Sequence, residues 1–180
     1  SFIDKKDFSG ISDIDVIVIY KKLNKKKFVD CVNQLEKIDI QKCGLKNYSL
    51  KINSSFGPLK YDKPNLAVIH LMVYDQKLHK EHVIKSPFTC YDWERSNTNK
   101  GKSLKEIFPV GTLQLIDFTE SRRSLNNYLE DINRGIISYR DYNFDQKLLS
   151  LNDIQINDEI SQNLNKNLIF QIHFAIKSIT

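Results

Sequence analysis

The 180-residue chain lacks the features that mark disulfide-stapled, zinc-ribbon and membrane-spanning proteins. Its three cysteines are an odd number and form no Cys-x-x-Cys pair, which suits a reducing cytoplasm. The longest apolar runs, such as Val16 to Tyr20 and Leu66 to Tyr74, fall short of the roughly 20 residues that a helix needs to cross a bilayer. No secretory signal is visible at the start. We therefore expect a cytoplasmic protein without disulfide partners or a membrane partner.

Glycine and proline are also scarce, at six and four residues, and they are scattered rather than gathered into a linker. No internal repeat or low-complexity tract is present. Apolar residues make up 41% of the chain and charged residues 27%, which is typical of a folded protein and excludes a wholly disordered one. The net charge of +5 favours an anionic partner, such as a nucleotide or a nucleic acid, without deciding between the two.

The spacing of apolar residues in the first half predicts strands and a helix. The β-branched run from Asp13 to Tyr20 predicts a strand covered on both faces. From Lys25 to Gln41 the spacing is helical, with Asn24 as the N-cap. A weakly alternating segment, Tyr48 to Phe56, and a strong strand, Leu66 to Tyr74, flank a turn signal and are candidate hairpin partners.

The second half is less regular. Between Asp75 and Lys105 no period is clear, and we expect irregular structure around the aromatic residues Phe88, Tyr91 and Trp93. Helical spacing returns from Val110 to Arg134, with Gly135 as a stop, and again from Leu164 to Ile179. These patterns predict an α/β (α+β) fold, in which a small mixed sheet is flanked by helices and followed by a C-terminal helical part.

The residues best suited to chemistry lie just before and within the first strand. Asp13 and Asp15 are two positions apart, so their side chains point to the same face about 7 Å apart. Two carboxylates that open an apolar strand need a counter-ion, and Mg²⁺ prefers carboxylate and phosphate oxygens. Gly10 and Ser12 predict a turn in front of the strand, which would let backbone amides approach phosphates. The alternative is that the two aspartates are solvent-facing acids at the entrance of a strand.

With these residues the sequence resembles the DNA polymerase beta-like nucleotidyltransferase superfamily. The signature of that superfamily is a Gly-Ser pair, a spacer of about a dozen residues, and Asp-x-Asp opening an apolar strand. The resemblance is specific over residues 1–20 and extends in the order of elements to residue 74. The glycine that should precede the first serine is absent, so we expect the chain to be a piece of a longer protein. The matching positions are Ser1, Gly10, Ser12, Asp13 and Asp15.

The resemblance implies the roles of these residues. Ser1, Gly10 and Ser12 would contact the phosphates of a nucleoside triphosphate such as ATP. Asp13 and Asp15 would hold Mg²⁺ and align the α-phosphate for in-line attack, with pyrophosphate leaving. The implied reaction is metal-dependent transfer of a nucleoside monophosphate to an acceptor hydroxyl. The acceptor is a small molecule, a protein or an RNA end.

The same resemblance implies a nucleotidyltransferase catalytic domain over residues 1–110, lacking its own N-terminus, and a helical C-terminal region over residues 111–180 that is also truncated. Family members carry a third carboxylate on a later strand, where this chain has His70. If the register places His70 opposite Asp15, an imidazole would occupy the position of the base, although it is a poor Mg²⁺ ligand. Asp75, at the end of the strand, is the alternative third group.

Rival hypotheses remain beside the enzymatic one. His70 could be a buried histidine satisfied by hydrogen bonds, in which case the chain is a nucleotide- or partner-binding module that has lost turnover. A basic nucleic-acid-binding domain is a third hypothesis, weakened by the dispersal of the basic residues. The spacing of His79 and His82 lacks a metal-site pattern and indicates a surface cluster.

Overall fold

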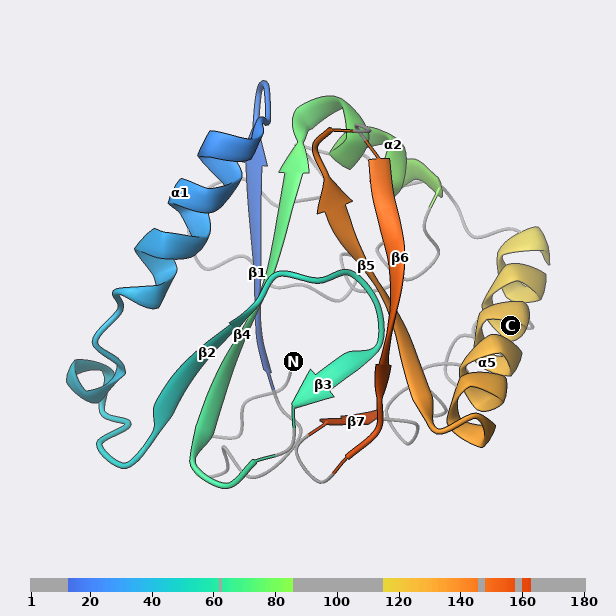
Figure 1. Cartoon of the computed structure of the whole chain (residues 1–180). Coiled ribbons are helices and arrows are strands. Elements are labelled where there is room, and N and C mark those ends of the chain that lie inside the picture. Colours follow the sequence, from blue (N-terminus) through green and yellow to red (C-terminus); the bar gives the residue numbers. More distant parts are fainter. Residues whose placement is uncertain (1–12, 62, 86–114, 146–147, 158–159, 163–180) are drawn as a thin grey trace.

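The computed structural model describes residues 13–61, 63–85, 115–145, 148–157 and 160–162, which form a mixed α/β structure with three helices (Figure 1). The predicted phosphate-binding residues Ser1, Gly10 and Ser12 lie outside these ranges. The aromatic cluster of residues 88–93 and the last predicted helix also lie outside them. Within the described ranges, no helix has the length and apolar character needed to cross a membrane.

The centre of the fold is a three-stranded sheet in the order β1 (Asp13–Tyr20), β4 (Leu66–Asp75) and β2 (Ser49–Asn53). Both outer strands run parallel to β4. The middle strand is buried along nearly its whole length, which explains its almost unbroken apolar sequence. The two strong strands expected from the sequence are therefore present and are direct neighbours.

The predicted hairpin between residues 48–56 and residues 66–74 is wrong. β2 and β4 are parallel, and the chain between them forms a short strand, β3 (Leu59–Tyr61). This strand pairs antiparallel with β7 (Ile160–Gln162). A pattern of alternation indicates which face of a strand is buried but not the direction of its partner, and for that reason the sequence could not decide between the two arrangements.

One face of the sheet is covered by α1 (Lys25–Glu36). The helix begins at the predicted N-cap, where the Asn24 side chain accepts a hydrogen bond of 2.9 Å from the backbone N–H of Lys27. It ends before the predicted Gln41, and a 3₁₀ helix, Ile40–Cys43, follows. The apolar side chains in this layer come from alternate positions of the strands and from one side of the helix: Ile14, Val16, Val18, Leu50, Ile52, Ile69, Leu71, Val73, Phe28, Val32 and Leu35.

A second helix, α2 (Gln76–Lys85), follows β4 directly. The expectation of irregular structure from Asp75 onward is therefore wrong for these residues. Asp75 supplies the reason for the turn from strand to helix, because its carboxylate accepts hydrogen bonds of 3.0 Å from the backbone N–H groups of Lys77 and Leu23. His79 of this helix is 1% exposed, so its expected place on the surface is also wrong.

The prediction of a wholly helical C-terminal region is wrong, because strands follow its first helix. The predicted helix is present as α5 (Leu115–Asn133) and is followed by Gly135, whose φ of +72° suits a stop. Beyond it, β5 (Ile136–Asn143) and β6 (Leu148–Gln155) form an antiparallel hairpin. This hairpin is a separate two-stranded sheet, so the expected single mixed sheet is in fact a parallel sheet with antiparallel pairs beside it.

The hairpin is tied to the parallel sheet by polar and aromatic contacts. The hydroxyl of Tyr142 donates a hydrogen bond of 2.6 Å to the carbonyl of Val73 in β4. Its ring packs edge-on against Phe28 of α1 and Phe56, with centroids 5.4 Å apart in each case. In Figure 1 the hairpin lies between the parallel sheet and α5, and α5 contacts β5.

Replacing Asp75 with alanine should lower the free energy of unfolding by about 1 kcal/mol at pH 7, the usual cost of a lost N-cap. The hydrogen bonds from Leu23 and Lys77 lower the pKa of Asp75 in the folded protein. Its stabilising effect is therefore complete above the unfolded pKa of about 3.9 and is lost as the pH falls through the folded value. Urea unfolding at pH 7 and at pH 3 measures the difference.

The matched control is Glu81→Ala, which removes an exposed carboxylate from the same helix. It should change stability by less than about 0.5 kcal/mol at either pH. An equal loss for both variants, or a loss for Asp75→Ala that grows at low pH, would contradict the capping role.

Candidate metal centre

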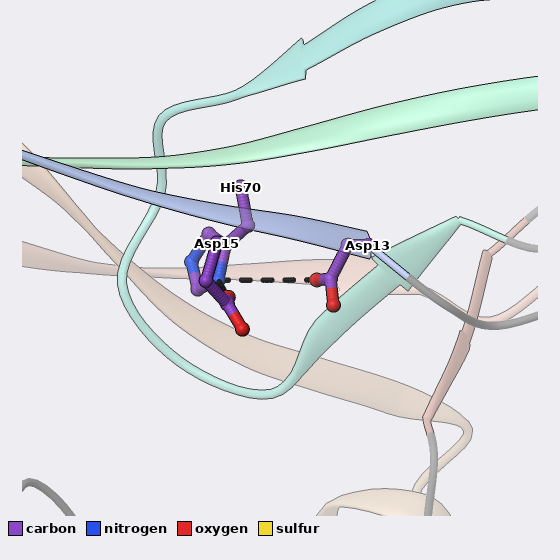
Figure 2. Close-up of side chains that lie close together, drawn as sticks. All are labelled: Asp13, Asp15 and His70. Atoms are coloured by element: carbon purple, nitrogen blue, oxygen red, sulfur yellow. Dashed lines mark hydrogen bonds and ion pairs between the residues drawn. The ribbon is translucent and has the colours of Figure 1, made fainter. Parts of the chain in front are cut away.

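The site lies on the face of the parallel sheet opposite α1. Even-numbered residues of β1 pack against α1, so Asp13 and Asp15 point to the other face. The register aligns Asp15 with His70 of β4, and His70 in turn with Asn53 of β2. The condition that the sequence left open, His70 opposite Asp15, is therefore met. Figure 2 shows the side chains of Asp13, Asp15 and His70 directed toward one another.

The three side chains converge closely enough to hold one ion. The Nδ1 atom of His70 lies 3.1 Å from Oδ1 of Asp15 and 3.9 Å from Oδ2 of Asp13. One ligand atom from each residue lies within 4.8 Å of the other two. Asp13 and His70 are buried, whereas the side chain of Asp15 is 45% exposed. The group could therefore bind a metal ion, with solvent access on the side of Asp15.

The hydrogen bonds of His70 fix which nitrogen faces the carboxylates. Its Nε2 atom lies 2.9 Å from the backbone carbonyl of Ser55. A carbonyl can only accept, so Nε2 carries the hydrogen and donates it. The Nδ1 atom is left facing Asp15, where it can donate a hydrogen bond to the carboxylate or, without a hydrogen, offer its lone pair to a metal. A histidine held in this way by a carbonyl is the usual arrangement around metal ions in proteins.

Ser55 is held in place by Asn53, a residue that the sequence did not single out. The Oδ1 atom of Asn53 accepts hydrogen bonds from the backbone N–H of Ser55 at 3.2 Å and from its hydroxyl at 2.6 Å. Its Nδ2 atom donates to the carbonyl of Leu59 at 3.1 Å. Asn53 and Ser55 are both buried, so these bonds are shielded from water. The only signal in the sequence was an amide at the end of a weak strand.

Lys60 is the second residue that the sequence analysis missed. It comes from β3, and its ammonium group forms an ion pair with Oδ2 of Asp13. The side chain of Lys60 is 20% exposed and that of Asp13 is 7% exposed, so the pair is largely removed from water. Lys60 offsets the cost of burying Asp13, and a metal ion at this oxygen has to compete with it.

Charge around Asp15 keeps its carboxylate ionised. Burial acts to raise the pKa of Asp15, but the hydrogen bond with His70 and the positive charges of His70 and Lys60 outweigh it and lower the pKa below its ordinary value. An ionised carboxylate is the form that binds cations. The alternative interpretation, two acids facing solvent at a strand entrance, is wrong for Asp13, which is buried.

Asp75 does not join the site. The register places it opposite Tyr20 at the far end of β1, where both of its oxygens are engaged by backbone N–H groups. Of the two candidates for the third group, the structure brings only His70 to the aspartate pair. A separate hollow of about 460 Å³ lies between α5 and β5, and none of the three site residues lines it.

Replacing Lys60 with methionine should lower the free energy of unfolding of the metal-free protein by about 3 kcal/mol, because the buried Asp13 carboxylate loses its partner. Urea unfolding in the presence of a chelator measures the loss. The matched control is Lys42→Met, which breaks an ion pair with Asp39 whose lysine is 84% exposed and should cost less than about 1 kcal/mol. Equal losses for the two variants would show that Lys60 is not the compensating charge.

Comparisons of the chain with protein families, with curated proteins and with solved structures return no match. The resemblance to the nucleotidyltransferase superfamily therefore depends on the residues of this chain alone.

Proposed function

We propose that the chain is a metal-dependent nucleotidyltransferase, which transfers a nucleoside monophosphate from a nucleoside triphosphate to an acceptor hydroxyl of a small molecule, a protein or an RNA end. The observation that supports this function best is the convergence of Asp13, Asp15 and His70 from two adjacent parallel strands. Two carboxylates and a third polar group at one point, accessible from solvent, suit an ion that also contacts phosphate oxygens.

Each residue of the site has a role in this proposal. Asp13 and Asp15 bind the ion, which when bound neutralises charge on the triphosphate and helps orient the α-phosphate. Asp15 is the more exposed of the two and lies on the side from which the nucleotide approaches. Lys60 stands beside Asp13 and adds a positive charge next to the phosphates. Ser1, Gly10 and Ser12, which precede β1 in the chain, contact the phosphates.

His70 can act in this reaction either as a general base or as a metal ligand. As a general base, the role that the resemblance implies, it would accept the proton of the acceptor hydroxyl. As a ligand it would direct Nδ1 at the ion. The Nδ1 atom faces the two carboxylates, and the residue is 9% exposed, which leaves little room for an acceptor hydroxyl beside it. These contacts favour the role of ligand.

A second candidate function is supported by the ion pairs themselves. Lys60 forms an ion pair with Asp13, and the His70 ring contacts Asp15, so the chain's own side chains can stabilise the two carboxylates without a metal. A chain that uses its own side chains in this way would be a binding module for a nucleotide or a protein, without turnover. The nucleotidyltransferase needs both aspartates and a metal for turnover, whereas the binding module needs neither to bind its partner.

The test is release of pyrophosphate from each of the four common ribonucleoside triphosphates with a divalent metal and an acceptor mixture of glucose, a short RNA and protein. Replacing a residue that hydrogen-bonds to a metal ligand usually lowers activity roughly 10–100-fold. Asp13→Asn and Asp15→Asn alter the ligands themselves, so each should lower the rate of pyrophosphate release by more than that. The control is Asp30→Asn, which alters an exposed carboxylate on α1, across the sheet from the site, and should leave the rate unchanged.

Turnover that survives both site substitutions would contradict the enzymatic proposal. Absence of turnover together with nucleotide binding that needs neither metal nor aspartates would favour the binding module. Circular dichroism of each variant separates a lost function from a lost fold.

A further inference from the structure

We propose that the site formed by Asp13, Asp15 and His70 is a transition-metal site that prefers Mn²⁺ to Mg²⁺. The inference deepens the proposed function by naming its ion, and it rests on that function only for the use made of the metal. Metal binding itself depends on three side chains and on the loop that orients one of them.

The separations of the His70 Nδ1 atom from the two carboxylates fit one ion with six-fold coordination. Two ligands held at about 2.1 Å from the same ion are about 3 Å apart when adjacent and about 4.2 Å apart when opposite. The Nδ1 atom of His70 lies 3.1 Å from the Asp15 oxygen and 3.9 Å from the Asp13 oxygen, which falls within this range. All three residues lie on paired strands, so the fold sets their spacing.

The identity of the third ligand decides which ion the site prefers. Mg²⁺ prefers oxygen ligands, and an imidazole in place of the third carboxylate removes one of them. Divalent ions of the first transition row accept imidazole nitrogen, and Mn²⁺ combines this with a preference for carboxylate and phosphate oxygens. Two oxygens from Asp13 and Asp15 with one nitrogen from His70 therefore suit Mn²⁺ better than Mg²⁺.

The loop after β2 prepares His70 for this role. The Ser55 carbonyl accepts a hydrogen bond from Nε2, so Nδ1 is the nitrogen directed at the carboxylates. Asn53 in turn holds Ser55 through two hydrogen bonds. This buried chain of contacts fixes the orientation of the ring before any ion arrives, which is how surrounding residues tune metal ligands in proteins.

Lys60 sets the cost of metal entry. Its ammonium group contacts the same Asp13 oxygen that lies 3.9 Å from His70. A divalent ion carries twice the charge of an ammonium group and attracts this carboxylate more strongly at the same distance. Entry of the ion therefore releases Lys60 from Oδ2 of Asp13.

The experiment measures binding of Mn²⁺ to the full chain, stripped with a chelator, by loss of the free-ion electron paramagnetic resonance signal. Mg²⁺ is measured by competition. We expect the wild-type chain to bind Mn²⁺ at least about 10-fold more tightly than Mg²⁺. His70→Asp, which supplies a third carboxylate, should keep Mg²⁺ binding and bring the ratio of the Mn²⁺ and Mg²⁺ affinities close to 1. The control Glu36→Gln, at the exposed end of α1, should leave the ratio unchanged.

A spectroscopic measurement separates a ligand from a base. Electron spin echo modulation of the bound Mn²⁺ should show a directly coordinated nitrogen in the wild-type chain, and His70→Gln should abolish it. Bound Mn²⁺ without nitrogen coordination, or equal affinity of the wild-type chain for the two ions, would overturn the proposal even if the variants fail to fold.

The outcomes also separate this inference from the proposed function. Absence of metal binding would overturn the metal site and leave Lys60 and His70 as the permanent partners of the two carboxylates. Tight Mn²⁺ binding through His70 without any pyrophosphate release would support the metal site while contradicting the nucleotidyltransferase.

Discussion

The arrangement of the site depends on one constraint, the burial of negative charge on the face of an otherwise apolar sheet. Asp13 is 6% exposed, and a carboxylate so far from water is costly unless cations or hydrogen-bond donors lie against it. Lys60 and His70 both reach the carboxylate pair, from β3 and β4 respectively. The negative charge of the two carboxylates, which these side chains contact, would also attract a metal ion to this position.

The segment between β2 and β4 provides most of what surrounds the aspartates. Parallel neighbours need a long connection, because the chain has to return to the end of the sheet at which the first strand begins. Here the connection carries the Ser55 carbonyl that orients His70 and the Lys60 ammonium that pairs with Asp13. Gly57 allows its tight passage, since it has a φ of +132° and a Cβ there would lie 3.3 Å from the backbone of Tyr139.

Elements with a strong local signal were predicted well. β1, β4, α1 with its Asn24 cap and the main part of α5 followed from apolar spacing and end signals. The direction of β2, the helix after Asp75 and the β5–β6 hairpin were not predicted. Their local patterns are weak, and the structure stabilises them through distant partners, such as the Tyr142 hydroxyl on the carbonyl of Val73. Tertiary contacts override local preference in such segments.

The sequence by itself determined that Asp13 and Asp15 share one face of a strand, because side chains alternate along every strand. It also placed His70 inside a buried strand, where a polar ring needs a partner. The tertiary structure alone decided that this partner is Asp15 and that Lys60 reaches Asp13, since the register of parallel strands and the path of a connecting loop are set by contacts between residues far apart in the chain.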